Sequence, residues 1–178
     1  MLRKYSEVLN LPVICASNGK RAGVVRDVLF SMETREVTAF LLEHRGVEIA
    51  RRLVPLKEVL GLGAGALIID SSAGISKMGR DEYLRTFGKN KSILGLRIFT
   101  KDGEDLGFVK DFVFDPATGR MEGVEVSEGF FRDVVNGRSI LPLFGKVEFS
   151  EENVLVGREA VEEMANTGGG IKNRLGKE

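Results

Sequence analysis

Short runs of apolar residues, bounded by Gly, Asp, Asn and Pro, recur along most of the chain. The run at 107–114 is rich in Val and Phe, as β-strands are, and it lies between two turn signals. Before it, Asp102-Gly103 is a two-residue hairpin signal, and after it residues 115–120 combine Asp, Pro and Gly in the order that a turn favours. Further short runs follow at 121–127, 140–143 and 153–156. Strands spaced by roughly 8–12 residues predict a small antiparallel barrel or sandwich.

The same unit occurs twice. Residues 19–37 match residues 103–121 without a gap, as in Gly19 with Gly103 and Asp27 with Asp111, and later strands also correspond. Each copy, about 7–72 and about 92–158, is so short that alone it would bury only a small core. We therefore expect two tandem domains that stabilise each other.

Helical patterns are few. A weak one covers 80–87 and ends at a glycine, and a clearer one covers 158–165 before the glycines at 168–170. The sequence thus predicts a first repeat at 1–75, a linker with helical character at 76–91, a second repeat with a C-terminal helix at 92–166, and a flexible tail at 167–178.

The ordered motif of the second copy resembles the PRC-barrel family. It comprises Leu94-Gly95, Asp102-Gly103, Leu106-Gly107, Val109, Asp111, Asp115-Pro116 and Thr118-Gly119-Arg120, followed by Leu141-Pro142-Leu143 and Val154-Leu155-Val156. The first copy keeps Gly19, Gly23, Val25, Asp27, Thr34 and Val54-Pro55-Leu56, but departs at Ser31-Met32 and Arg35. The two matches span most of the chain.

This family includes the cytoplasmic domain of the photosynthetic reaction-centre H subunit and the C-terminal domain of a bacterial 16S ribosomal RNA processing factor. The resemblance implies an all-β chain, with two tandem small antiparallel β-barrels, a short C-terminal helix and a mobile tail. It also implies an adaptor or assembly module without a shared set of catalytic residues. A role in RNA processing or ribosome maturation is an expectation by analogy.

Composition narrows the classes of function. Lys and Arg number 26, as do Asp and Glu, so a protein that binds nucleic acid directly through a strongly basic surface is not expected. One Cys and one His exclude an intramolecular disulfide and a site built on several histidines of one chain. No apolar run reaches the about 20 residues of a membrane span, and no secretory signal begins the chain, so we expect a cytoplasmic protein.

Charge is distributed unevenly between the halves. Residues 1–90 carry 14 Lys and Arg against 10 Asp and Glu, whereas residues 91–178 carry 12 against 16. Two faces for different partners, head-to-tail pairing of copies, and drift between two solvated surfaces all account for this difference. A homodimer is compatible with it.

The candidate site residues are mostly structural in this interpretation. Gly23, Gly107 and Gly119 mark turns and strands, and the repeated Asp27 and Asp111, inside apolar strands, require backbone N–H or Arg partners. Asp115 belongs to a turn, so no metal site is predicted. Cys15 is expected in the core, His44 in a solvated turn, and residues 61–65 in a loop without a phosphate-binding spacing.

Phe130 and Phe131, with Arg132, are the candidates for binding a partner, because adjacent side chains on one strand cannot both face one core. Packing on the other barrel is the alternative for these two rings. We therefore expect a non-enzymatic adaptor without a cofactor, bound to another protein. The alternative is a regulatory protein that binds a small ligand or metal between the barrels, near Asp111, Asp115 and residues 61–65, and a hydrolase with an unrecognised site is a third hypothesis.

Overall fold

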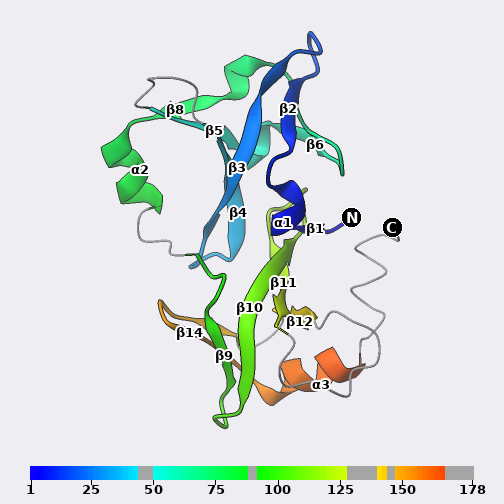
Figure 1. Cartoon of the computed structure of the whole chain (residues 1–178), viewed down its shortest axis with the longest axis vertical. Helices are drawn as coiled ribbons and strands as arrows, with labels where there is room; N and C mark the ends of the chain where they lie inside the picture. The colour runs from blue at the N-terminus through cyan, green and yellow to red at the C-terminus, as the bar shows by residue number, and fades with distance from the viewer. Residues whose placement is uncertain (44–49, 88–91, 128–139, 144–146, 167–178) are drawn as a thin grey trace. The chain divides into compact units, whose positions relative to one another are not determined.

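Hairpin turns at glycines organise the chain into strands that pair mainly with their neighbours in sequence. The computed structural model in Figure 1 describes residues 1–43, 50–87, 92–127, 140–143 and 147–166, with the backbone alone for 163–166. The prediction of an all-β fold is confirmed, because two curled sheets contain most of the regular secondary structure in these residues. The predicted tail at 167–178 lies outside the described residues.

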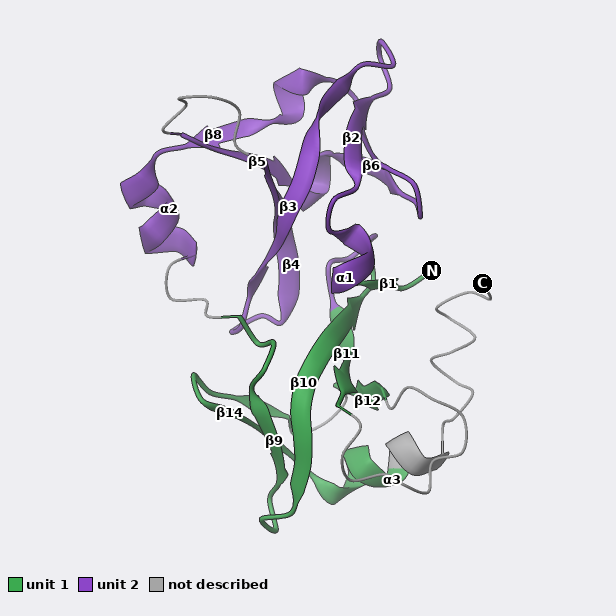
Figure 2. Cartoon of the chain, in the orientation of Figure 1, with its two compact units in different colours: residues 1–4, 91–115, 121–178 green, residues 5–90, 116–120 purple. Residues whose placement is uncertain are grey.

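The chain divides into two compact units, coloured in Figure 2. Unit 2 contains residues 5–90 and 116–120, and unit 1 contains residues 1–4, 91–115 and 121–178. Each unit therefore includes a short segment from the other repeat of the sequence. The repeat boundary in the sequence and the boundary of the compact unit do not coincide, which sequence similarity alone does not reveal.

The sheet of unit 2 has the strand order β6-β7-β2-β3-β4-β5-β8. Residues 76–78, expected within a linker, are a strand that pairs with β5, and the helical pattern at 80–87 is confirmed as α2. The elements are α1 (Tyr5–Val8), β2 (Pro12–Cys15), β3 (Arg21–Ser31), β4 (Glu36–Leu42), β5 (Arg51–Pro55), the 3-10 turn η1 (Leu56–Glu58), β6 (Val59–Leu62), β7 (Leu67–Ile69), η2 (Ser72–Gly74), β8 (Ser76–Met78) and α2 (Arg80–Phe87).

The sheet of unit 1 repeats this arrangement with the order β12-β11-β10-β9-β14-β13, and β1 pairs with β10. The predicted C-terminal helix is confirmed as α3, which packs against β12. The elements are β1 (Arg3–Lys4), β9 (Arg97–Thr100), β10 (Asp105–Phe114), β11 (Met121–Val126), β12 (Ile140–Pro142), β13 (Glu148–Phe149), β14 (Asn153–Val156) and α3 (Arg158–Asn166).

One pairing in each sheet is parallel. β2 pairs with β7, and β9 pairs with β14, because the chain of each repeat returns beside its first sheet strand. The sequence predicted only antiparallel neighbours, since turn signals report on hairpins and carry no information about this closing contact. The pairing curls each sheet around its own core.

At two equivalent core positions, the units have their large and small side chains exchanged. Val28 pairs with Phe40 across β3 and β4, whereas Phe112 pairs with Val124 across β10 and β11. All four side chains are at most 2% exposed. One large ring and one small side chain thus fill each core from opposite strands, which conserves the volume of the pair.

Candidate functional site

A β-bulge at the same place in both units positions the repeated carboxylates. The register slips between Val25 and Asp27 and between Val109 and Asp111, so one residue of each strand is unpaired. The Oδ1 atom of Asp27 accepts hydrogen bonds from Val28 N at 2.8 Å and from the Tyr5 hydroxyl at 3.0 Å. The Oδ1 atom of Asp111 accepts one from Phe112 N at 2.7 Å. These carboxylates thus bind backbone N–H groups beside the bulges.

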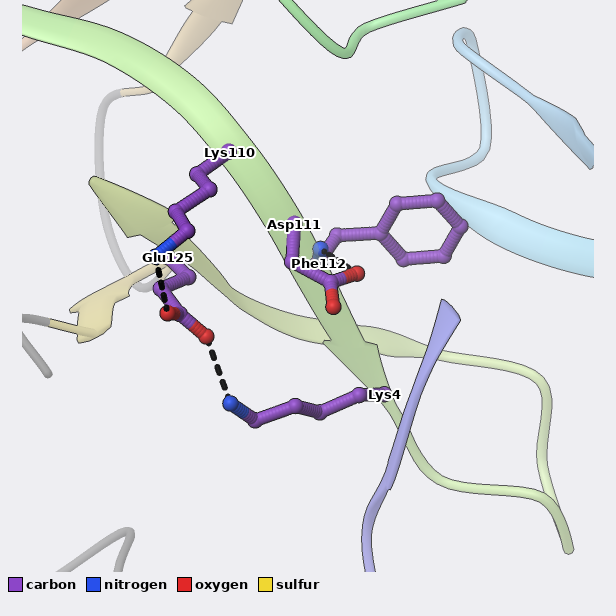
Figure 3. Close-up of polar contacts among 5 residues, drawn as sticks. All are labelled: Lys4, Lys110, Asp111, Phe112 and Glu125. Atoms are coloured by element: carbon purple, nitrogen blue, oxygen red, sulfur yellow. Dashed lines mark hydrogen bonds and ion pairs between the residues drawn. The ribbon is translucent and has the colours of Figure 1, made fainter. Parts of the chain in front are cut away.

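Next to the bulge of unit 1, a buried ion pair fastens the first strand. Figure 3 shows the carboxylate of Glu125 with a lysine at each oxygen. Lys4 Nζ lies 2.5 Å from Oε2, and Lys110 Nζ lies 3.7 Å from Oε1. The side chains of Lys4 and Glu125 are 9% and 8% exposed, so water screens this pair weakly. The arrangement holds β1 against β10.

The equivalent face of unit 2 is apolar. Leu41 pairs with Asp27 as Glu125 pairs with Asp111, and Leu41 belongs to a buried cluster with Leu29, Ala39 and Leu53. Met78, Tyr83 and Phe87 pack against this cluster, so β8 and α2 cover the sheet. At this equivalent position, unit 1 therefore has a buried ion pair, whereas unit 2 has a leucine in an apolar cluster that β8 and α2 cover.

Tyr83, on α2, contacts both a charged and an aromatic side chain. Arg51 lies over its ring, 5.6 Å from the centroid, and the Phe87 ring is 5.4 Å away. Burial raises the pKa of Tyr83, the charge of Asp27 raises it further, and Arg51 lowers it. The phenol therefore stays protonated over a wider pH range than an exposed tyrosine, which suits a structural role.

A different surface carries the exposed apolar side chains of unit 1. Residues opposite each other on neighbouring strands share a face, so Phe99 and Leu155 lie together, with Phe108 diagonal to Phe99. Phe108 is 44% exposed and Leu155 is 38% exposed. We call Phe99, Phe108 and Leu155 the β9 face. The opposite sides of these strands, at Ile98 and Val154, are buried, so apolar side chains lie on both sides of the sheet. Arg97, which pairs with Phe108, shares the β9 face with its three apolar residues.

Unit 2 has the same face at equivalent positions. Ile14 pairs with Ile68, and Val24 lies on the same side of the neighbouring strand, opposite Pro12. We call Ile14, Val24 and Ile68 the β2 face, and all three are half-buried. Leu60, in the strand beyond Ile68, is 64% exposed. Strands with one solvated face normally alternate apolar and polar residues, and these strands do not.

Polar groups frame the β9 face. Arg97 Nη2 lies 3.4 Å from Asp105 Oδ2, and Lys101 Nζ lies 2.7 Å from Glu148 Oε1. Exposed aromatic side chains together with arginine are typical of protein–protein interfaces. Sequence reasoning missed both faces, although the signal is present: β2 and β7 read Pro-Val-Ile-Cys and Leu-Ile-Ile, without a polar residue on either side.

The remaining candidate residues from the sequence lie in different parts of the structure, and some lie outside the described residues. Phe130, Phe131 and Arg132 lie outside the described residues, as does His44. Cys15 is buried, as expected. Residues 61 and 62 belong to β6, and Gly63 N donates to Ala66 O, so the expected loop is the tight end of a hairpin. Asp111 and Asp115 belong to unit 1 and residues 61–65 to unit 2.

Two of the predicted glycines occupy conformations that other residues rarely adopt. Gly107 has φ +103°, and a Cβ there would lie 2.7 Å from Ser127 Oγ. Gly119 has φ +80°, and a Cβ there would collide with the carbonyl oxygen of Val37. The Gly119 carbonyl in turn accepts a hydrogen bond from Val37 N at 2.7 Å. The turn at 116–120 is thus a structural part of unit 2.

Among the described residues, no group of three or more His, Cys, Asp or Glu side chains is placed to hold a metal ion. None of the helices in the same residues is long and apolar enough to cross a membrane.

Comparison with known proteins agrees with the repeated architecture. No curated protein matches the chain. The family model for the PRC-barrel domain matches it twice, at residues 2–75 and 88–162. These matches cover most of the chain and coincide with the two halves that carry the equivalent bulges and the equivalent parallel pairings. The chain therefore belongs to the PRC-barrel family and contains two copies of the domain in tandem.

Proposed function

We propose that this chain is a non-enzymatic adaptor or assembly module that binds another protein through its outward sheet faces. The β9 face carries the proposal, because Phe108 and Leu155 are 44% and 38% exposed although their strands, β10 and β14, each have a paired strand on both sides. Aromatic side chains surrounded by a polar rim are typical anchors of protein interfaces. A role in RNA processing or ribosome maturation extends this proposal by analogy within the family.

The experiment is site-specific photo-crosslinking in the native cell. A photoreactive phenylalanine analogue replaces Phe108, and in a matched chain it replaces Leu84, which is 50% exposed on α2. We expect one or a few protein adducts from position 108 that position 84 does not give. Ribonuclease treatment before purification separates a direct protein contact from one that RNA bridges.

A substitution pair provides the second readout. Phe108→Ser removes the ring from the β9 face, and Leu84→Ser is the control that removes a similarly exposed apolar side chain elsewhere. We expect Phe108→Ser to abolish capture of the crosslinked partner by the purified chain, and Leu84→Ser to preserve it. Equal capture by both variants, with unchanged thermal unfolding, would refute the proposed site.

A further inference from the structure

The two outward faces have opposite charges at equivalent positions. Gly19 and Gly103, with φ +69° and +90°, end equivalent hairpin turns, which differ by one residue in length: Gly19 N donates to Cys15 O, and Gly103 N donates to Thr100 O. In unit 2 this turn is followed by Lys20 and Arg21, and in unit 1 by Glu104 and Asp105. Two consecutive basic residues thus stand where the other repeat has two consecutive acidic ones.

These charges border the apolar faces directly. Arg21 pairs with Ile14 of the β2 face, and Asp105 pairs with Phe99 of the β9 face, so each charge shares a surface with its apolar neighbour. At the opposite ends of the sheets, the hairpin between β6 and β7 contains Gly63-Ala64-Gly65, whereas the one between β13 and β14 contains Glu151-Glu152. Arg97 and Lys101 lie among these acidic residues and pair with Asp105 and Glu148, but the acidic residues outnumber them. The border of the β9 face is therefore acidic on balance, and that of the β2 face is basic.

We propose that the occupant of the β9 face is the β2 face of a second copy of this chain. The proposal rests on the proposed function, because it names the partner that the same surface binds. Like faces would bring Lys20 and Arg21 against their own copies, or Glu104 and Asp105 against theirs, and like charges in contact select against such pairing. Contact between the β2 face of one copy and the β9 face of another places basic residues against acidic ones beside the apolar side chains. The pairing of copies is therefore head to tail.

The small size of each face predicts that a single contact between two copies is weak. Each face has three apolar residues at its centre, which is few for a stable interface that buries about 800 Å² per partner. Every copy carries both faces, so one head-to-tail contact leaves a face of each kind open to a further copy, and association increases with the concentration of the chain. The apolar centres supply affinity, and the charged borders set which face meets which.

The test is the mass of the full chain in solution by sedimentation equilibrium, at low and high salt. We expect wild-type chain at about 100 µM to have at least twice the monomer mass, and to dissociate more at 1 M salt, where charges are screened beyond about 3 Å. Phe108→Ser should weaken association at least tenfold, and Leu84→Ser should leave it unchanged. A monomer at every concentration would overturn the proposal.

Exchanging the hairpin residues between the repeats provides the decisive variants. Lys20→Glu/Arg21→Asp gives a chain with two acidic borders, and Glu104→Lys/Asp105→Arg gives a chain with two basic borders. The hairpins should tolerate these changes because each repeat already carries the other's charge at the same place. We expect each double variant alone to associate at least tenfold more weakly, and an equimolar mixture of the two to recover wild-type association.

The quadruple variant, with both hairpins exchanged, should also recover association. Association of either double variant at wild-type strength would contradict pairing of the two faces, as would a mixture that stays monomeric. Failure of this test leaves the crosslinking at position 108 as a separate readout: an adduct with a different protein would support the adaptor and refute the second copy as its partner.

Discussion

The ammonium group of Lys4 lies 2.5 Å from the carboxylate of Glu125, although 121 positions separate them in the sequence. Both side chains are buried in unit 1, and Lys4 lies on the strand that pairs with β10. The equivalent position of unit 2 is Leu41, within an apolar cluster. The same position of the sheet therefore has a buried ion pair in one repeat and apolar packing in the other.

This pair predicts a characteristic set of stabilities. Glu125→Leu alone removes the carboxylate that lies beside the buried Lys4 ammonium group, so we expect a loss of about 3–5 kcal/mol in the free energy of unfolding. Lys4→Met/Glu125→Leu removes both charges and should recover most of this loss. Denaturant unfolding of wild type, the two single variants and the double variant measures the coupling, and additive effects would contradict a direct interaction.

The exchange of segments between the units predicts where a core substitution acts. Leu2 is 2% exposed and belongs to unit 1, so Leu2→Ala should destabilise that unit by about 2–5 kcal/mol. We expect faster amide hydrogen exchange in β10 and β11, far along the sequence, and little change in β3 and β4. Val13→Ala, a buried position of unit 2, is the control with the reverse pattern.

Gly119 provides a second test of this exchange. Gly119→Ala combines a positive φ with a collision against Val37, so we expect a loss of about 2–5 kcal/mol, the sum of strain and overpacking. Gly103→Ala is the matched control, since Gly103 also has a positive φ but no atom within 4 Å of an added Cβ. It should lose only about 1–2 kcal/mol. Thermal unfolding compares the two, and equal losses would argue against the contact with Val37.

The exchanged core sizes predict a compensating double substitution. Phe40→Val leaves a cavity and should cost about 2–4 kcal/mol, and Val28→Phe overfills the core at about 1–3 kcal/mol. Val28→Phe/Phe40→Val reproduces the pair that unit 1 has at Phe112 and Val124, so it should be more stable than either single variant. A double variant as unstable as the sum of the singles would show that the backbones of the two cores differ too much for the exchange.

The environment of Tyr83 predicts a pH dependence. Its folded-state pKa is raised, mainly by burial, above the ordinary value of about 10. The protonated phenol therefore stabilises the fold fully below about pH 10, and this contribution is lost as pH rises through the folded-state pKa. Absorbance titration of the Tyr5→Phe variant, which retains Tyr83 as its only tyrosine, should give a midpoint above 10. A midpoint at or below that value would contradict burial of the phenol.

The sequence by itself determined the repeat, most strands and most turns. Gly19 and Gly103, and the bulge carboxylates Asp27 and Asp111, depend on local backbone geometry, which the residue types of a short segment specify. The helices at 80–87 and 158–166 were also predictable, because their apolar residues recur at helical spacing before a glycine. Local patterns report reliably on contacts between residues that are close along the chain.

Only the tertiary structure decided the contacts between distant segments. The parallel pairing of β9 with β14, the place of residues 1–4 in unit 1 and that of Gly119 in unit 2 depend on which segments meet in space. The apolar faces became visible in the same way, because Phe99 and Leu155 are 56 residues apart and form one surface only when their strands pair. Pattern along one strand assigns a side chain to one of two faces, but which face is buried depends on the segments that pack against it.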